Sequence, residues 1–261
     1  MSVQTSVVRF EVEQGVMSVV LQRPEVLNAY SEEMLDGLIQ AMEEAGRNKE
    51  VKALVISGAG RAFCAGGDVK SMSDFTPLDI HDFVGKLNYL VRSMSKLEKP
   101  IIAAVHGYAA GAGICLALAC DLILASEDAK FSAGFAQIGL VADGGGMFFL
   151  PRTLGTYRAK EMLFTGKVLS ATKAQEWGLV NEIYPAETVM EEAQKLAIQL
   201  AKGPSRTYAM VKKLANQALT ADLEAMLDME RNTQAVMAGT ADHREGVQAF
   251  KEKRKPLFSG E

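Results

Sequence analysis

The chain has 261 residues, of which 48% are hydrophobic and 23% charged, and its formal net charge is −4. These values are typical of a globular protein built around one large core. A slightly acidic chain gives no reason to expect nucleic acid as the main partner. The N-terminus carries charges early and lacks the apolar stretch of a signal peptide, so we expect no signal peptide.

The cysteines argue against a disulfide-stabilised protein, and the histidines argue against a metal-binding protein. The three cysteines form no C-x-x-C pair, which predicts a reducing, cytoplasmic location rather than a disulfide framework. The three histidines lie far apart and show no ligand spacing, so we expect no metal site.

Hydrophobic periodicity and capping residues predict the elements of the first half in chain order. Strands are expected at 7–13 and 16–21 around a Gln14-Gly15 turn, and Ser31 is expected to cap a helix that ends near Gly46. There follow a strand at 52–57, an exposed loop at 71–79, a helix at 82–97 and a strand at 101–105.

Residues 101–120 carry no full charge and are long enough to span a bilayer. Because this stretch contains several glycines and His106, a strand, a glycine turn and a buried helix explain it better, and we expect no membrane span. Short strands are predicted at 122–125 and from Phe131. After Pro185 the pattern is helical, at 187–202, 205–219 and 223–238.

Two stretches of small residues stand out, Phe63–Asp68 and His106–Gly113, and each follows a predicted buried strand. Small residues allow a ligand to approach backbone N–H groups, and the second stretch opens a helix, whose first N–H groups lack intrahelical partners. Two such loops aimed at one point could hold a developing oxyanion. The alternative is that the small residues only permit close packing of helix and strand.

These loops and further landmarks resemble the enoyl-CoA hydratase/isomerase (crotonase) superfamily over essentially the whole chain. The landmarks are Arg23-Pro24, Leu27-Asn28-Ala29, Ala62–Asp68, Lys99–Gly107, Cys120-Asp121, Ala129–Phe131, Leu163–Gly166, Gly178–Val180, Glu245–Phe250 and Lys253–Pro256.

The resemblance implies an α/β fold, a crotonase-like spiral of ββα units followed by a C-terminal helical trimerisation region. The spiral core would cover residues 1–190 and the helical oligomerisation region residues 191–261, giving a homotrimer or a hexamer that is a dimer of trimers. The substrate would be an acyl-CoA thioester, with coenzyme A as part of the substrate and no other cofactor.

The resemblance also assigns site residues. Gly67 and Ala112 would donate the two backbone N–H groups that hold the thioester oxygen as an enolate. The further residues expected to bind CoA or substrate are Leu27, Ala29, Ala65, Gly66, Asp68, Val69, Phe135, Phe250 and Lys253, with the CoA phosphates near Lys253.

The chain departs from the family's hydratases at their two catalytic glutamates, because those positions hold Cys115 and Phe135. An acid appears instead at Asp143, in a glycine-rich turn. This is similar to the isomerase subgroup of phenylacetate degradation, whose single catalytic aspartate sits in such a turn. Asp143 is therefore interpreted as the acid/base residue, and its apolar neighbours could raise its pKa.

Each of these residues also has a structural interpretation. Asp143 could simply cap the helix predicted at 144–154. Cys115 could be a nucleophile but is better explained as a small buried thiol. Phe135 could line the acyl pocket or only fill the core, and the basic residues Lys251 to Lys255 could be solvated surface or contact phosphate.

The favoured function is an acyl-CoA isomerase that moves a double bond, or rearranges a ring epoxide, through an enolate. The first alternative is an enoyl-CoA hydratase with Asp143 as its only base. A hydrolase similar to the 4-chlorobenzoyl-CoA dehalogenases would need a histidine at Asn88 and a tryptophan at Phe135, and neither is present. The last alternative is an inactive CoA-binding scaffold.

Overall fold

The computed structural model describes residues 7–68 and 75–261. Within these ranges the main sheet has six strands in the spatial order β1-β2-β3-β4-β6-β9. β1 is antiparallel to β2, and the other neighbours are parallel. The strands are β1 (Val8–Glu13), β2 (Val16–Leu21), β3 (Ala53–Gly58), β4 (Ile101–Val105), β6 (Leu122–Ser126) and β9 (Glu182–Tyr184).

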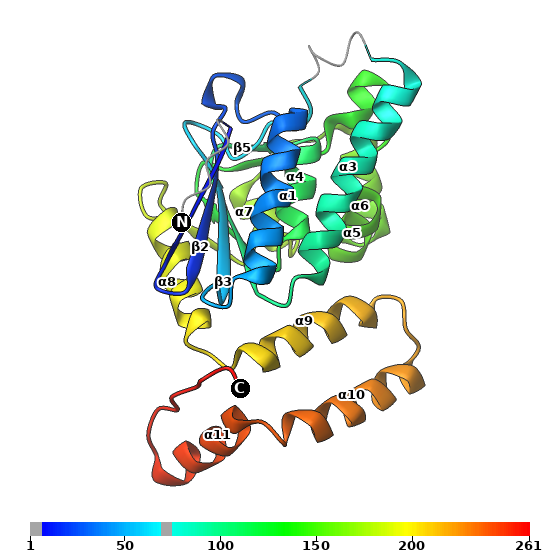
Figure 1. Cartoon of the computed structure of the whole chain (residues 1–261). Coiled ribbons are helices and arrows are strands. Elements are labelled where there is room, and N and C mark those ends of the chain that lie inside the picture. Colours follow the sequence, from blue (N-terminus) through cyan, green and yellow to red (C-terminus); the bar gives the residue numbers. More distant parts are fainter. Residues whose placement is uncertain (1–6, 69–74) are drawn as a thin grey trace.

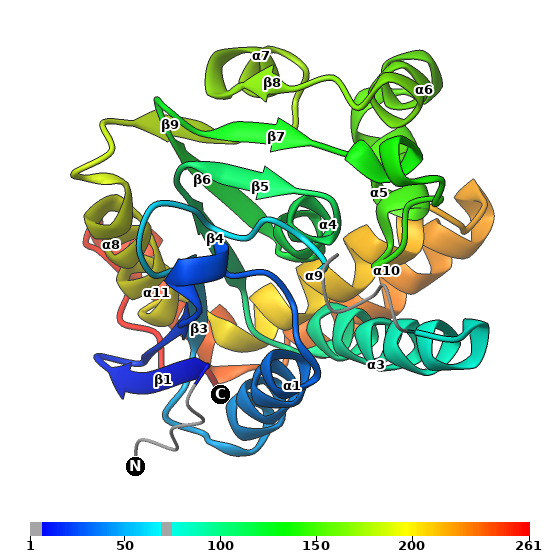
Figure 2. The same cartoon turned by 90° about the horizontal axis from the view of Figure 1, so that it is seen from above.

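A smaller sheet lies beside the main one (Figure 2) and contains, among the described residues, β5 (Tyr108–Ala110), β7 (Lys130–Ser132) and β8 (Leu169–Ser170). The chain passes from β4 to β5 and helix α4 (Ala112–Ala119), and then from β6 to β7. In both of these passages a strand of the main sheet is followed directly by a strand of the smaller sheet. The predicted α/β class with a spiral of ββα units is confirmed.

Helices cover both faces of the main sheet (Figure 1). α1 (Glu32–Arg47) contacts β1 and β2 and packs against α3 (Pro77–Lys96), whereas α8 (Val189–Ala201) contacts the strands from the other side. Side chains alternate accordingly along β3: Leu54 and Ile56 belong to the larger core, and Ala53 and Val55 pack with Val189 of α8.

Capping residues explain where the first long helices begin. The Ser31 side chain accepts a hydrogen bond from the Met34 backbone N–H, as the sequence predicts for α1. α3 begins at Pro77, because Thr76 and Asp79 form a capping box with proline in the first turn. The sequence predicted an exposed loop up to residue 79 and a helix from residue 82, and this prediction was wrong about where the helix begins.

Among the shorter helices, two lie between β7 and β8 of the smaller sheet and one leads from β8 to β9 of the main sheet. They are α5 (Gly146–Leu154), α6 (Thr156–Thr165) and α7 (Ala171–Glu176), with single 3-10 turns η1 (Pro24–Val26) and η2 (Gly134–Ile138). The uncharged stretch 101–120 divides into β4, β5 and α4. In the described part of the chain no helix combines the length and the apolar character that crossing a bilayer requires.

The C-terminal helices form a separate layer beneath the body (Figure 1). They are α9 (Ser205–Ala218), α10 (Leu223–Met237) and α11 (Ala241–Glu252). The boundary expected at residue 190, between the spiral core and the helical region, falls inside α8. Because α8 packs on the main sheet, the separate helical layer begins at α9. Lys212 of α9 joins this layer to the body, with Nζ 2.8 Å from Asp121 Oδ2.

Candidate active site

The two loops of small residues lie against each other. Cys64 in the first loop and Ala109 in β5 form an isolated parallel bridge. The Cys64 N–H donates to Tyr108 O at 3.0 Å, and the Ala110 N–H donates to Cys64 O at 3.0 Å. Strand-like hydrogen bonds therefore bring together two segments that follow different strands of the main sheet.

Close packing between these loops requires glycine at two positions. Gly66 has φ +97°, and a Cβ on it would lie 2.7 Å from Ala110 O and 3.0 Å from Ala112 N. A Cβ on Gly113 would collide with Cys64 O. The packing interpretation of the small residues is thus correct for Gly66 and Gly113, and it coexists with the expected ligand-binding role of their neighbours.

Gly67 and Ala112, the two residues expected to hold the thioester oxygen, lie at one cavity. Ala112 is the first residue of α4, so its N–H has no intrahelical acceptor, and neither N–H donates to another residue in the described ranges. Both residues line a cavity of about 210 Å³. The positive end of the α4 dipole lies at Ala112, which makes this a favourable place for a developing negative charge.

Asp143 faces the same cavity from the turn before α5. The N-cap of α5 is Gly145, and no side chain caps it, so the capping interpretation of Asp143 was wrong. The Oδ1 atom of Asp143 is buried and has no hydrogen-bond partner among the described residues. Burial raises the pKa of this carboxyl to about 6, which suits a group that must accept and return a proton near neutral pH.

The glycine turn that carries Asp143 rests on Cys115 of α4. A Cβ on Gly144 would lie 3.2 Å from Cys115 Cβ, and a Cβ on Gly146 would lie 2.8 Å from Cys115 Sγ. Cys115 is fully buried, and burial raises the pKa of its thiol well above the usual value. A thiol that stays protonated is a poor nucleophile, so the interpretation of Cys115 as a small buried side chain holds.

Apolar side chains from three segments form another wall of the cavity. Phe135 and Ile138 come from η2, Leu140 follows η2, and Phe83 comes from α3. Phe135 is thus both buried and a lining residue, so its two interpretations are compatible. Phe83 was missed from the sequence because an apolar residue on the inner face of a helix carries no sign that it borders a cavity rather than the core.

The turn at Leu27 and Ala29 supports the first loop from outside the cavity. The Ala65 N–H donates to Leu27 O at 2.9 Å, and the buried side chain of Asn28 donates to Ala59 O at 2.9 Å. Leu27 and Asn28 both have left-handed backbone angles, φ 54° and 56°. The turn is thereby fastened to the residues that precede Gly66 and Gly67.

Asp68 also participates in this attachment. Its carboxylate lies 3.2 Å from Arg23 Nη2, and Arg23 donates to Ala29 O at 2.7 Å. Arg23 and Asp68 therefore connect the turn to the end of the loop. Val69, which was also expected to bind CoA or substrate, lies outside the described residues.

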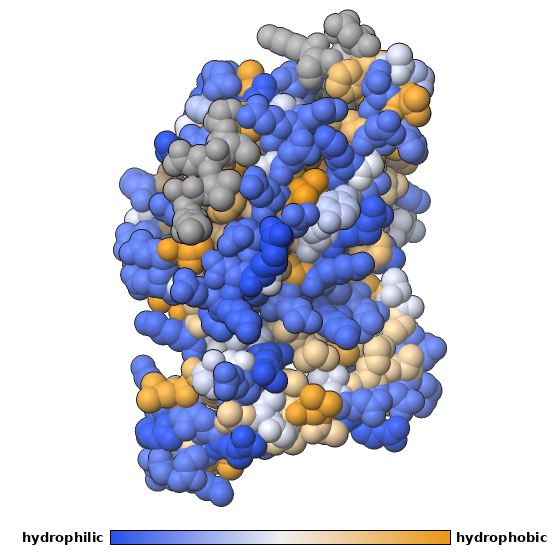
Figure 3. All heavy atoms as spheres, in the orientation of Figure 1, coloured by the Kyte–Doolittle hydropathy of each residue, from blue (hydrophilic) through white to orange (hydrophobic). Residues whose placement is uncertain are grey.

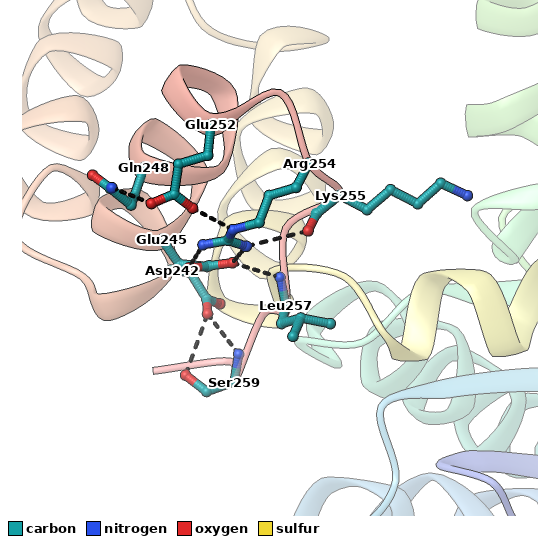
Figure 4. Close-up of polar contacts among 8 residues, drawn as sticks. All are labelled: Asp242, Glu245, Gln248, Glu252, Arg254, Lys255, Leu257 and Ser259. Carbon is teal, nitrogen blue, oxygen red and sulfur yellow. Dashed lines mark hydrogen bonds and ion pairs between the residues drawn. The ribbon is translucent and has the colours of Figure 1, made fainter.

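Phe250 and Lys253 belong to the end of α11, in the lower helical layer, and do not line this cavity within one chain. In the basic run, Arg254 is committed to ion pairs with Glu245 at 2.6 Å and Glu252 at 2.6 Å, whereas the Lys255 side chain points away from them (Figure 4). Only part of the run is therefore available for a ligand.

Comparison with known proteins agrees with this geometry. A family model described as enoyl-CoA hydratase/isomerase matches residues 11–261. The chain belongs to the enoyl-CoA hydratase/isomerase family.

Two curated relatives in the enoyl-CoA hydratase/isomerase family come from Escherichia coli (strain K12). The 1,2-epoxyphenylacetyl-CoA isomerase is 42% identical over 95% of this chain and 97% of its own length. The 2,3-dehydroadipyl-CoA hydratase is 34% identical over 95% of this chain and 96% of its own length. Relatives at this level thus include both an isomerase and a hydratase.

A solved structure of the same family has nearly the same backbone. The enoyl-CoA hydratase subunit I from Geobacillus kaustophilus matches with a TM-score of 0.93 and 35% identity, over 98% of this chain and 100% of that one. Across residues 7–68 and 75–261, no group of three or more His, Cys, Asp or Glu side chains is arranged to hold a metal ion.

Proposed function

We propose that this enoyl-CoA hydratase/isomerase family member is an acyl-CoA isomerase that works through a thioester enolate. Asp143 is the only acidic residue among the described residues that line the cavity, and this observation carries the proposal. Moving a double bond requires one base that takes a proton at one carbon and returns it at another. A single carboxylate is sufficient for that work.

The positions of the three catalytic groups fit this reaction. The N–H groups of Gly67 and Ala112 would hold the thioester oxygen while it carries negative charge. Asp143 borders the same cavity, with a pKa raised by burial to about 6, so it is mostly ionised at pH 7 and still a usable acid. Phe83, Phe135 and Leu140 supply an apolar wall for the acyl group.

The relative named 1,2-epoxyphenylacetyl-CoA isomerase supports the same choice and extends it to a ring epoxide as a candidate acyl group. The phenylacetate pathway is accordingly the proposed setting. No other cofactor is required by this chemistry, since coenzyme A arrives with the substrate. A cytoplasmic location remains our proposal, and the three cysteines are free.

Hydration of an enoyl-CoA is the second candidate, favoured by the relative named 2,3-dehydroadipyl-CoA hydratase. Hydration adds an oxygen and a proton to adjacent carbons. The resemblance implies that family hydratases divide this work between two glutamates, at the positions of Cys115 and Phe135 here. Neither side chain transfers protons as a carboxylate does, so we propose that hydration is the slower reaction.

The lower layer supports an oligomer. α9 and α10 contain no buried residue in the single chain, and Val211, Leu223, Leu227 and Val236 are exposed. Apolar side chains also appear on the surface of this layer in Figure 3. Apolar surface of this kind favours association, and we propose a homotrimer or a hexamer.

A turnover experiment tests the proposed function. The protein is incubated in deuterated water with linear 2-enoyl, linear 3-enoyl and ring-epoxide CoA thioesters, and the products are followed by mass spectrometry and NMR. We expect double-bond migration or ring rearrangement, with deuterium entering where the proton is exchanged. Water addition as the dominant reaction would favour the hydratase, and no turnover of any thioester would favour a scaffold.

A further inference from the structure

Three side chains with polar atoms line the cavity at which Gly67 and Ala112 lie. Among the described residues these are Ser132, Gln137 and Asp143, and the other lining residues are glycine or apolar. The proposed reaction uses only Asp143. In a mostly apolar pocket a few polar groups usually fix the orientation and the specificity of the ligand, so Ser132 and Gln137 are candidates for that role.

The side chain of Gln137 lies against two glycines. Gln137 belongs to η2, and a Cβ on Gly134, at the start of the same turn, would lie 3.0 Å from Gln137 Oε1. A Cβ on Gly166, at the end of α6, would lie 2.5 Å from Gln137 Nε2. The amide therefore lies between η2 and the end of α6, in space that a larger residue at position 166 would take.

Ser132 lies beside this amide, and its hydroxyl hydrogen is already used. The hydroxyl donates to Gly166 O at 3.0 Å. The same Cβ position on Gly134 that lies near Gln137 Oε1 is 3.8 Å from Ser132 Oγ. Because a serine hydroxyl has a single hydrogen, Ser132 can offer a ligand in the cavity only an acceptor.

The amide of Gln137 is the side-chain donor that remains among the described residues of the cavity. Ionised Asp143 only accepts, the Ser132 hydrogen is used, and the N–H groups of Gly67 and Ala112 are proposed to hold the thioester oxygen. Within the described ranges the Gln137 side chain makes no hydrogen bond to another residue. Its NH₂ group can therefore turn toward a ligand.

The charges around the cavity decide which kind of oxygen suits this donor. No positively charged side chain occurs among the described lining residues, and Asp143 is mostly ionised at pH 7. A carboxylate on the acyl group would be desolvated beside a like charge with no cation to pair with it. The oxygen that fits is therefore uncharged.

We infer that Gln137 is a specificity-determining residue, whose amide donates a hydrogen bond to a neutral oxygen on the acyl group. The substrate class is an acyl-CoA with an ether, epoxide or hydroxyl oxygen in addition to its thioester oxygen. The inference names the acyl group of the proposed isomerase and rests on that function only for the reaction that follows binding.

The test is binding of saturated CoA thioesters, measured by calorimetry, because these contain no double bond to move. Cyclohexylacetyl-CoA is compared with the isomers that have an ether oxygen in place of one ring CH₂ group. Heptanoyl-CoA and an analogue with an ether oxygen in its chain form a second set. Gln137→Met keeps the length of the side chain and removes the amide. Gln199→Met is the matched control, because Gln199 is exposed on α8 and does not line this cavity.

In Gln137→Met we expect an ether thioester to bind about 2- to 10-fold more weakly, because one hydrogen bond is lost, while the hydrocarbon partner binds no more weakly than before. A greater loss in the ring set assigns a ring oxygen, and a greater loss in the chain set assigns a chain oxygen. Gln199→Met should change neither set, and circular dichroism should show the same fold for all variants.

Equal changes for the ether and hydrocarbon thioesters in folded Gln137→Met would overturn the inference. Tighter binding of adipyl-CoA than of its uncharged methyl ester would also overturn it, because the site would then prefer an ionised oxygen. A selective loss of ether binding, in a protein whose wild type isomerises no thioester, would support the inference and refute the proposed function instead.

Discussion

Cys115 and Gly146 are in direct contact, since a Cβ on Gly146 would lie 2.8 Å from Cys115 Sγ. The small thiol therefore supports the turn that carries Asp143. A glutamate at position 115, where the resemblance places one in hydratases, would need the space that this turn occupies.

Asp143→Asn tests the base. The substitution keeps the shape and removes the basicity, and loss of a general acid–base residue typically costs about 100- to 10,000-fold in rate. Because Asp143 does not cap α5, we expect no loss of thermal stability. The rate of double-bond migration and the melting temperature are measured together, with the exposed Asp82→Asn as control. Migration at the wild-type rate would exclude Asp143 as the base.

The pH dependence of kcat/KM follows from the same carboxyl. Burial raises the pKa of Asp143 to about 6, and only the ionised form can accept a proton. We expect kcat/KM to fall about tenfold per pH unit below this value and to be level above it until another group titrates. A profile that remains flat from pH 7 down to pH 5 would contradict this assignment.

Gly67→Pro tests the oxyanion donor. Proline removes the backbone N–H, and no hydrogen bond within the described residues is lost, because that N–H has no acceptor there. We expect turnover to fall by about 100-fold or more while the circular dichroism spectrum is retained. Gly67→Ala, which keeps the N–H, is the comparison. Normal turnover by the proline variant would show that Gly67 is not a donor.

Leu227→Glu tests the oligomer. Leu227 is 48% exposed on α10, and a charge in an apolar contact between copies would weaken association. We expect sedimentation to show trimers or hexamers for the wild type and smaller species for the variant. Val168→Glu, at a similarly exposed position on the body, should sediment as the wild type does. A wild type that sediments only as a monomer at micromolar concentration would refute the proposal.

Local signals in the sequence determined much of the fold. Alternating apolar residues predicted β1, and the turn signal Gln14-Gly15 marked the start of β2. The sequences of β3 and β4 are mostly or wholly apolar because these strands are buried on both faces. Ser31 marked the start of α1. These features depend on residues near one another in the chain, so a single sequence is sufficient to predict them.

Contacts between distant segments were decided only by the tertiary structure. Gly67, Ala112 and Asp143 belong to three different segments but line one cavity. The pairing of Cys64 with Ala109 brings the first two segments together. The packing of the glycine turn on Cys115 brings the third segment to them. The sequence by itself determined which residues could do chemistry, whereas desolvation, which raises the pKa of Asp143, exists only after the chain has folded around it.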